Sequence, residues 1–422
     1  MRRRFGPTLA TPHSLLAACL CFVSSLLVIP ASGEETKPDQ RSRPLILAHY
    51  MPWHESLPHS GRWGWHWTMN HFNPSQMRRA PDGTLDDRRQ LASHFYPLAG
   101  CYDSGDLDLL EYHLQLMKLA GIDGVIVDWY GLTSFRDYGT LHRNTMLLVQ
   151  VADRMGMKVA ICYEDQTVPA LVKAGRIGPG DQDAHVVKEL SWLLKNWSTL
   201  QGYVRLDGRP VLLSFGHAGL SDEQWTDVIA KLDHPVAYFS EHHQRDAAVG
   251  AFDWPIPDQG VQQTVAFNKR SNGTPNIPVA FPRFVDIYQE AGVGDGYREI
   301  ADANGNTFRE TFRRAIESKS PIVQIATWND WGEGTVIEPS QEFGYRDLEL
   351  IQETIGRTST SRVRYGRDDL RLPLRLYLLR KSRPDLAVKL NQVATSLNNG
   401  DVALARRQLK SPDFLDEKTH NN

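Results

Sequence analysis

The sequence predicts an α/β fold in which eight parallel strands and their crossover helices close into a (β/α)8 TIM barrel, with a small C-terminal helical extension. Short apolar runs rich in β-branched and aromatic residues alternate with stretches of helical periodicity along most of the 422 residues. The runs are apolar on both faces, which is typical of a parallel sheet covered by helices. An open, doubly wound sheet is less well supported, because the chain has neither a GxGxxG motif after a strand nor a P-loop.

Eight runs supply the strands of this barrel. They span residues 45–50, 124–130, 158–164, 210–215, 236–241, 251–256, 277–282 and 321–328. The clearest helix is predicted over 106–121, where Leu109, Tyr112 and Leu116 share one face and Gly121 provides the stop. Four further helices are predicted over 141–156, 183–197, 222–232 and 307–318. The fifth and sixth strands are weak and lie close together, so the count of eight depends most on them.

The two ends of the chain differ from the barrel. Residues 1–33 are predicted to be a signal peptide, because MRRR is followed by an apolar stretch and by the small residues ASG. A transmembrane anchor is the alternative, although the apolar stretch is short for one. A polar linker is expected over 34–44, the barrel over 45–358, and two or three arginine-rich amphipathic helices over 359–422. We expect these helices to pack on the base of the barrel; a surface that binds acidic glycan or another protein is the alternative.

The composition argues against several classes of function. Lys and Arg number 47 and Asp and Glu 50, so the net charge of −3 gives no footprint for nucleic acid. Signal cleavage leaves only Cys101 and Cys162, too few for a disulfide framework, and their spacing leaves their pairing open. With no CxxC pair and no HExxH motif, neither a metal nor a cofactor is expected. We expect the mature chain in the periplasm, at the cell surface or secreted, with no stable membrane insertion.

In a barrel the functional groups gather where strands end, because all eight carboxyl ends face the same side. These positions hold carboxylates, aromatic rings and amides: His49, Tyr50, Trp53, Asp128, Trp129, Tyr130, Tyr163, Glu164, Asp165, Glu241, His242, Trp254, Arg283, Trp328, Asn329, Asp330 and Glu333. Aromatic faces pack against the C–H faces of sugar rings, while amides and carboxylates bind hydroxyl groups. The loop after the first run adds further aromatic residues, which either fix the loop or line a sugar-binding groove.

The stretch ATWNDWGEGTVIEPS contains the strongest candidates for catalysis. Asp330 and Glu333 stand three residues apart on a glycine-rich turn, where both carboxyl groups can face one cavity. Glycoside hydrolysis uses two carboxyl groups, one protonated to release the leaving oxygen and one ionised. We expect Trp328 and Trp331 to form an apolar wall that raises the pKa of the acid, and either Asn329 or backbone amides to keep the other carboxylate ionised. The alternative is a structural turn whose acids cap the following helix.

Four stretches of the chain together resemble a known family: TWNDWGEGTVIEP, HYMPW (49–53), CYDSGDLDLLEYHLQLMKLAGIDGVIVDWYG (101–131) and FVDIYQEAG (284–292). They are similar to the glycoside hydrolase family 71/99-like group, which includes the endo-α-mannosidase family 99 and the WbsX-like proteins of polysaccharide loci. The resemblance runs from about residue 45 to 355. It implies a (β/α)8 barrel and an extracytoplasmic, glycan-acting enzyme that retains the anomeric configuration.

The resemblance also implies roles for the two carboxylates. The family 99 pattern in this loop is Asn-Glu-Trp-x-Glu-Gly-Thr, in which the first glutamate acts as a base on the sugar's own 2-hydroxyl and the second as general acid/base. These roles fall here on Asp330 and Glu333. Asp330 is one methylene shorter than the family 99 base, whereas the family 71 α-1,3-glucanase pattern, which the loop also resembles, has aspartate there. Mannosidase specificity is therefore not carried over.

The resemblance and the strand ends together select the residues expected to bind substrate. Asp128, Trp129 and Tyr130 match the second-strand DWY of the group. The other candidates are Tyr50, Trp53, Tyr163, Trp328, Asn329 and Trp331. We therefore expect an exported glycoside hydrolase that acts on an α-linked oligo- or polysaccharide and is endo-acting and retaining. The alternatives are a non-catalytic glycan-binding or polysaccharide-assembly protein on the same barrel, and a lyase or transferase using the same acids.

Overall fold

Eight parallel strands form the centre of the molecule in the computed structural model, which describes residues 43–79, 85–270, 273–358 and 365–414. They are β1 (Leu45–Tyr50), β4 (Gly124–Trp129), β5 (Lys158–Glu164), β7 (Arg209–Phe215), β8 (Ala237–Glu241), β9 (Gly250–Phe252), β10 (Val279–Ala280) and β11 (Ile322–Ile325). Neighbouring strands pair in the order β10-β11-β1-β4-β5-β7-β8-β9. A parallel bridge between Phe252 and Ile277 joins the two ends of this sheet. The predicted barrel is confirmed, including its weak fifth and sixth strands.

Proline shortens two of the predicted strands. β9 ends at Phe252, three residues before Pro255, and β10 is confined to two residues between Pro278 and Pro282. A proline has no N–H group to donate to a neighbouring strand, so the ladder cannot continue through it. The strands are therefore shortest at this side of the barrel.

The last strand is also shorter than predicted, for a different reason. β11 ends at Ile325, after which the chain folds into a turn in which the Thr327 N–H donates to the Thr335 carbonyl at 3.0 Å. Trp328, predicted as the final residue of the strand, therefore lies on this turn. The candidate catalytic residues follow it directly.

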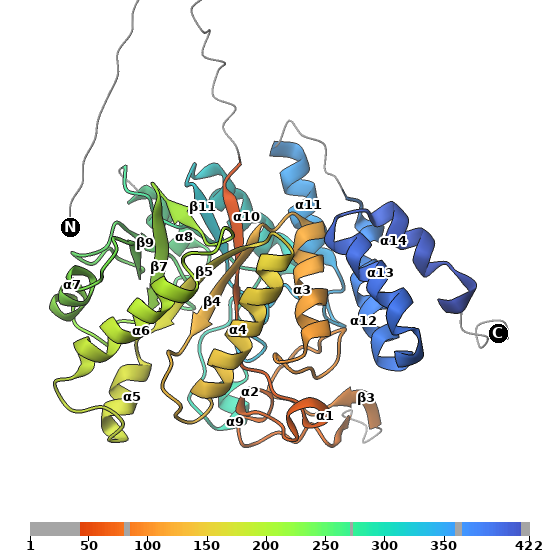
Figure 1. Cartoon of the computed structure of the whole chain (residues 1–422), viewed down its shortest axis with the longest axis horizontal. Coiled ribbons are helices and arrows are strands. Elements are labelled where there is room, and N and C mark those ends of the chain that lie inside the picture. The colour runs from red at the N-terminus through yellow and green to blue at the C-terminus, as the bar shows by residue number, and fades with distance from the viewer. Residues whose placement is uncertain (1–42, 80–84, 271–272, 359–364, 415–422) are drawn as a thin grey trace, which may run out of the picture. The chain divides into compact units, whose positions relative to one another are not determined.

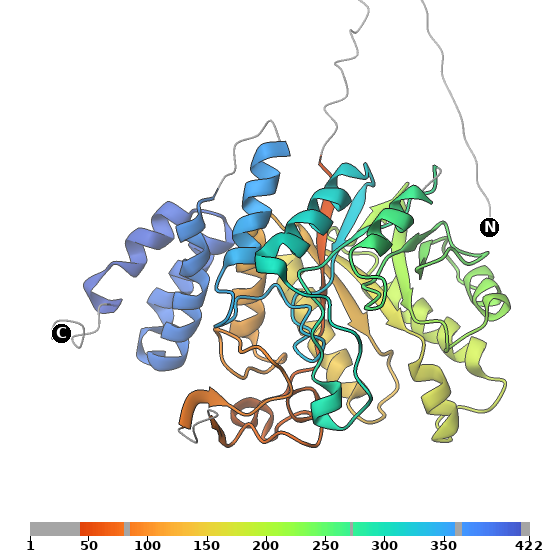
Figure 2. The same ribbon diagram turned by 180° about the vertical axis from the view of Figure 1, so that it is seen from behind.

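Helices cover the outside of the barrel (Figures 1 and 2). They are α3 (Leu107–Ala120), α4 (Tyr138–Arg154), α6 (Gln182–Asn196), α7 (Asp222–Ala230), α8 (Gln262–Lys269), α10 (Asn306–Glu317) and α11 (Arg346–Thr358). The helices predicted from periodicity are among them. In α3 the Asp106 side chain accepts a hydrogen bond from the Asp108 N–H at 3.0 Å, and Gly121, with a φ of 91°, ends the helix.

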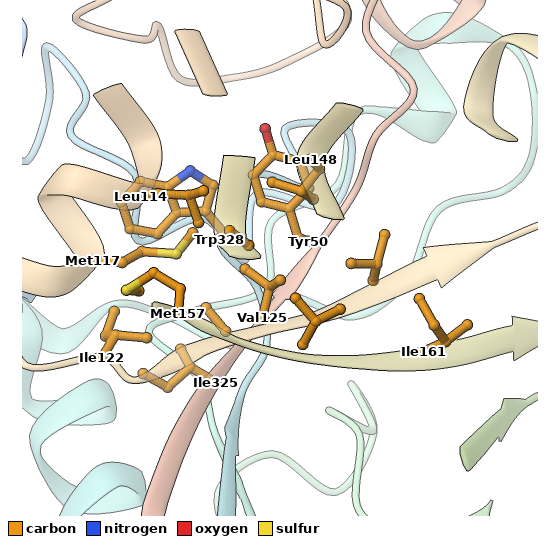
Figure 3. Packing of buried hydrophobic residues seen from close by; sticks show 14 of the residues in the cluster. Tyr50, Leu114, Met117, Ile122, Val125, Leu148, Met157, Ile161, Ile325 and Trp328 are labelled. Atoms are coloured by element: carbon orange, nitrogen blue, oxygen red, sulfur yellow. The ribbon is translucent and has the colours of Figure 1, made fainter. Parts of the chain in front are cut away.

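Side chains of the strands alternate between two packing layers. On β4, Val125, Val127 and Trp129 point outward into the layer shared with the helices, part of which is drawn in Figure 3. Ile126 belongs to the layer inside the barrel, and Asp128 has the same parity. The parity of a position within its strand therefore decides whether its side chain reaches the barrel interior.

Short elements cover the carboxyl ends of the strands, at the lower edge of Figure 1. The loop after β1 holds the single-turn helices α1 (Leu57–Ser60) and α2 (Trp65–Thr68), and a hairpin of β2 (Met77–Arg79) and β3 (Leu85–Arg89). The helix α9 (Tyr288–Ala291) joins them. α5 (Thr167–Lys173) follows β5 at the same end of the barrel, and β6 (Arg205–Leu206) pairs with the start of β7. All are too short for periodicity to predict.

Three helices, α12 (Leu372–Ser382), α13 (Ala387–Asn398) and α14 (Val402–Leu409), form the predicted C-terminal extension. They pack on the side of the barrel against α3, and not on its base as predicted (Figure 1). The rings of Tyr112 and Tyr377 stack with centroids 5.5 Å apart. Arg380 forms ion pairs with Asp108 at 3.0 Å and with Glu111 at 2.5 Å. The outer face of α3 thus offers these helices both an aromatic ring and two carboxylates.

Some predicted features lie outside the described residues. The signal peptide and most of the linker precede Arg43 and are among them. Within the described chain, no helix is long and apolar enough to cross a membrane. Cys101 and Cys162 are both free thiols, and Cys162 is buried on β5.

Candidate active site

Acidic side chains gather at the carboxyl end of the barrel. Asp128, Glu164 and Glu241 stand at or next to the ends of β4, β5 and β8, and Asp330 and Glu333 follow β11. Burial raises the pKa of each of these five carboxyl groups. Because such a cluster disfavours ionisation, it is typical of a site whose acids take part in proton transfer.

Hydrogen bonds fix Asp330 on the turn after β11. The Asp330 N–H donates to the Thr327 hydroxyl at 2.8 Å, and the Glu333 N–H donates to Oδ1 of Asp330 at 3.0 Å. The Asn329 side chain accepts from the Met51 N–H at 2.8 Å and donates to the Met51 carbonyl at 2.9 Å. Asp330 is therefore held relative to the first strand as well as to the last.

A neighbouring segment brings Tyr288 to the same turn. The Val285 N–H donates to the Glu333 carbonyl at 2.9 Å, so the two segments run side by side. Gly334 permits this approach, because its φ is 67° and a Cβ there would lie 2.6 Å from the Val285 carbonyl oxygen. Tyr288 then lies within hydrogen-bonding reach of the Glu333 carboxyl group.

A buried network supports the turn from behind. Trp331 Nε1 donates to the Tyr102 hydroxyl at 2.8 Å, and that hydroxyl donates to Glu338 at 2.7 Å. His113 connects Glu338 to Tyr50, with Nε2 3.1 Å from Glu338 and Nδ1 2.9 Å from the Tyr50 hydroxyl. All five side chains are buried, so water does not compete for the hydrogen bonds of Tyr102 with Trp331 and Glu338, or of His113 with Tyr50.

Asp330 opens onto a cavity of about 160 Å³. Its lining consists of Trp53, Trp65, His66, Met69, Tyr130, Tyr288, Asp330 and Gly332. Trp53 and His66 form one flat wall, since their rings stack with centroids 4.0 Å apart and planes 5° apart. A cleft of about 780 Å³ shares Trp65, His66 and Tyr130 with this cavity and continues toward α5. The cavity beside Asp330, called the catalytic cavity below for its candidate role, is therefore one end of a longer groove with aromatic walls.

Glu333 lies next to this cavity. Its carboxyl group approaches Tyr288, which is a lining residue. Glu333 Oε2 is enclosed and has no hydrogen-bond partner among the described residues. A buried oxygen without a partner is available to a group of the substrate.

The surroundings separate the pKa values of Asp330 and Glu333. Burial raises the pKa of Asp330 to about 6, and the backbone N–H groups of Glu333 and Gly332 oppose this rise by stabilising the ionised form. Burial, and then the charge of Asp330, raise the pKa of Glu333 well above its ordinary value. The same two causes raise the pKa of Asp128. The site thus favours the ionised form of Asp330 through backbone N–H groups and the protonated form of Glu333 through burial, the division that glycoside hydrolysis requires.

One acid near the cavity, Asp137, is paired with a histidine. No group of three or more His, Cys, Asp or Glu side chains in the described residues could hold a metal ion. His66 Nε2 lies 3.4 Å from Asp137, which fixes the ring that stacks on Trp53.

The structure brings five of the predicted site residues together. Trp53, Tyr130 and Asp330 line the cavity, and Glu333 lies beside it. Asp128 faces Asp330 closely enough for the charge of one to raise the pKa of the other. These five residues come from strands and loops far apart in the sequence.

Three aromatic residues predicted to bind substrate point away from the cavity, which corrects that expectation. Trp129 packs against Trp197 in the layer between the barrel and the helices, with ring centroids 5.3 Å apart. The Tyr163 hydroxyl donates to Glu189 of α6 at 2.6 Å, and Tyr50 belongs to the network behind the turn. All three have outward parity in their strands, so their rings cannot reach the interior.

The remaining predicted residues also support the turn from behind. Trp328 is fully buried beside Leu114 and Met117 of α3 (Figure 3), and Trp331 is buried in the network. Asn329 binds backbone groups, so the amides that favour an ionised Asp330 come from the turn itself. The aromatic wall predicted from these tryptophans is supplied instead by the loop after β1.

Other residues of the site were not among those selected from the sequence. Glu164, which stands among the strand-end positions, lines the groove, whereas its outward neighbour Tyr163 was the residue predicted to bind substrate. Trp65 and His66 lie in the aromatic loop, and Tyr288 belongs to the stretch FVDIYQEAG. Strand parity could have identified Glu164, whereas the loop residues carry no periodic signal.

Two family models match the chain. The model of glycosyl hydrolase family 99 matches residues 43–234, which include β1, the loop after it and the strand end at Asp128. The model of glycosyltransferase WbsX matches residues 291–351, which include Asp330 and Glu333. The predicted resemblance to a family 99/WbsX-like group is confirmed at both of its halves.

Individual proteins give the same result. The glycoprotein endo-α-1,2-mannosidase of Mus musculus is 20% identical over 354 residues, which is 75% of this chain and 72% of that protein. Its counterpart in Rattus norvegicus is 22% identical over 324 residues, 69% of this chain and 67% of that protein. The solved structure of the family 99 endo-α-mannosidase from Bacteroides thetaiotaomicron shares the fold, with a TM-score of 0.56 at 18% identity over 75% of this chain and 99% of that one. By these matches the chain is similar to the family 99/WbsX-like group, and the matches support a glycoside hydrolase on a (β/α)8 barrel.

Proposed function

We propose that this protein is an exported, retaining glycoside hydrolase that cleaves α-linked glycans within the chain, with Glu333 as general acid/base and Asp330 as the second carboxylate. The observation that carries the proposal is the contrast between these two acids at one aromatic-walled cavity. Asp330 has a pKa of about 6 and two backbone N–H groups that favour its ionised form. Glu333 has a pKa well above its ordinary value and an enclosed oxygen without a partner in the described chain.

A reaction of the family 99 type uses these states directly. Asp330 takes the proton of the sugar's 2-hydroxyl, O2 attacks C1, and the C1–O bond breaks as Glu333 gives its proton to the leaving oxygen. The product of this step is a 1,2-anhydro sugar, an epoxide. In the second step Glu333 takes a proton from water, the water oxygen opens the epoxide at C1, and Asp330 returns its proton to O2. Two displacements at C1 leave the anomeric configuration unchanged.

The sugar configuration tests the role of Asp330. O2 can displace the leaving oxygen only if the two lie on opposite faces of the ring, which holds for α-mannosides and not for α-glucosides. Cleavage of an α-mannan would therefore support Asp330 as a base on the 2-hydroxyl. Cleavage of an α-glucan would assign Asp330 a direct role at C1 or on water.

Cleavage within a chain is supported by the shape of the groove. The cleft of about 780 Å³ continues from the catalytic cavity and includes Trp63, Trp65 and Tyr130. Aromatic rings at successive positions bind successive sugar units. The amino-terminal residues 1–33 have the pattern of an export signal, so the mature protein made with this segment would begin near Glu34.

Incubation of the purified mature protein with α-glucans, α-mannans and acidic polysaccharides tests the function. We expect reducing ends to appear with one class, and oligosaccharides longer than one unit to accumulate early. Binding of a glycan with no release of reducing ends would instead favour a glycan-binding protein. Products that absorb ultraviolet light would identify a lyase.

A further inference from the structure

A second cavity, of about 420 Å³, lies beside the β2–β3 hairpin. We call it the hairpin pocket. Four arginines of the hairpin line it: Arg78, Arg79, Arg88 and Arg89. Its lining also includes three aromatic rings, those of Phe72, Phe95 and Tyr96. This combination of guanidinium groups and aromatic faces contrasts with the acidic catalytic cavity.

Part of the positive charge of the hairpin pocket is uncompensated. Arg88 is paired with Asp86 at 2.5 Å and with Glu342 at 3.0 Å. Arg78 and Arg89 form no ion pair with the part of the chain that the structure describes; Arg89 donates to a backbone carbonyl at 2.9 Å instead. Like charges gathered on paired strands destabilise a hairpin. An anion between these guanidinium groups would remove that repulsion.

One carboxylate also lines the hairpin pocket. Glu290 extends from α9, its side chain is 63% exposed, and its carboxylate lies 3.8 Å from His94. A single exposed acid paired with a histidine does not balance Arg78 and Arg89. Among the described residues, the lining of the hairpin pocket is therefore basic.

The hairpin pocket and the catalytic cavity share a wall. This wall is a small apolar cluster of Met69, Ala92, Ile287 and Ala291, with Phe72 and Tyr288 packed against it. Met69 and Tyr288 line the catalytic cavity, whereas Ile287, next to Tyr288 in the chain, lines the hairpin pocket. The arginines of the hairpin pocket therefore lie on the far side of this wall from Asp330.

We propose that the hairpin pocket binds an anionic group of the glycan substrate: a sulfate ester, a phosphate or a carboxylate. The guanidinium fork of arginine matches the oxygens of all three groups and forms charge-assisted hydrogen bonds with them. The aromatic rings suit the sugar that carries the anion. This proposal rests on the proposed function and narrows its substrate class to anionic, α-linked glycans.

Binding to a protein that carries Glu333→Gln tests the proposal without turnover. Calorimetric titrations would compare dextran sulfate with unsulfated dextran of the same length, and mannose 6-phosphate and oligogalacturonate with their neutral counterparts. We expect at least one anionic probe to bind at least about tenfold more tightly than its neutral counterpart, since charge-assisted hydrogen bonds are of that strength. Its affinity should fall as salt is added. The probe that binds identifies the anion.

A matched pair of variants locates the binding. Arg78→Glu reverses a charge in the hairpin pocket, and Arg407→Glu makes the same change on the exposed face of α14. We expect only Arg78→Glu to weaken binding of the anionic probe, by about tenfold or more, with circular dichroism unchanged. Arg78→Lys keeps the charge but not the forked guanidinium group, so its affinity for the anionic probe should lie between those of the wild type and Arg78→Glu. Equal affinities for anionic and neutral probes, or equal effects of the two Glu variants, would overturn the proposal. Anion binding by a wild-type protein that cleaves no glycan would overturn the proposed function alone.

Discussion

The raised pKa of Asp330 suits proton transfer. The same shift lowers the stability of the folded state at neutral pH. The pKa rises from 3.8 to about 6 on folding, chiefly through burial. Because the folded state holds the proton more tightly than the unfolded chain, folding is favoured most when the group is protonated in both states, below about pH 4. This favourable contribution is lost as the pH rises through about 6. At neutral pH the ionised carboxylate therefore destabilises the fold.

Asp330→Asn should relieve this cost. The amide keeps an oxygen for the Glu333 N–H and carries no charge. We expect the free energy of unfolding at pH 8 to rise by about 1–3 kcal/mol over wild type, and the difference to vanish near pH 4. Urea unfolding at both pH values measures it, with the exposed Asp233→Asn as control. A difference that does not change with pH would contradict the assigned shift.

Glu333→Gln should remove the proton donor and leave the fold intact. We expect kcat to fall by about 10²–10⁴ on the substrate found in the polysaccharide screen, the usual contribution of a general acid. The melting temperature should not fall. Glu299→Gln, an exposed acid on a nearby loop, is the control and should retain wild-type activity. Wild-type rates in Glu333→Gln would show that another group protonates the leaving oxygen.

The sequence could place the two candidate acids on one turn, but not predict the orientation of their tryptophan neighbours. Asp330 and Glu333 stand out because their spacing on a turn suits two carboxyl groups. A turn has no fixed period, so nothing local says whether Trp328 and Trp331 face the cavity. The Tyr102 hydroxyl and the apolar face of α3 decide it, and both become neighbours only through tertiary structure.

At the scale of elements, β4 shows that the position of a residue within its strand determines whether its side chain faces the barrel interior or the helices. Asp128 and Trp129 are adjacent, yet one faces Asp330 and the other packs under the helices. Since successive side chains alternate, an inward Asp128 already implies an outward Trp129. The strands themselves were predictable from apolar runs, and the length of β10 from its flanking prolines. The parity was available in the same stretch of sequence.

Trp129→Ala should therefore affect mainly the stability of the fold, and Tyr130→Ala mainly the binding of substrate. Loss of the fully buried Trp129 should lower the free energy of unfolding by about 3–5 kcal/mol. Tyr130 is partly exposed in the groove, so its loss should leave stability near that of wild type and raise KM several-fold. Chemical denaturation and steady-state kinetics on both variants measure this. A stability loss at Tyr130 as large as that at Trp129 would argue against its place in the groove.

At the scale of the whole molecule, the C-terminal helices leave the groove open. Their amphipathic pattern was enough to predict them, whereas their docking site depends on Tyr112 and on the carboxylates of α3, which look like ordinary helix residues in the sequence. They cover the side of the barrel, and the loops at the carboxyl ends of the strands stay free (Figure 2). We therefore expect the C-terminal helices to contribute to the stability of the fold and not to the groove.

Removal of residues 359–422 tests this division. We expect the melting temperature to fall by several degrees, because the deletion exposes Tyr112, which is 1% exposed in the intact chain. The value of kcat/KM for the folded fraction should stay within about twofold of the intact protein. If the shortened chain does not fold, the single variants Tyr377→Ala and Arg380→Ala give the same comparison. A large loss of kcat/KM with stability unchanged would place these helices at the substrate.

The amide of Asn329 has a consequence for biosynthesis. The Asn329 amide forms two hydrogen bonds with the backbone of Met51, which lies 278 residues earlier in the sequence. Asp330 is the residue after Asn329. During translation the rings of Trp53 and His66 are therefore synthesised long before Asp330 and Glu333. Asp330 and Glu333 therefore reach their places beside the first strand only once the last strand has paired with it, so the arrangement of the two acids reports completed closure of the barrel.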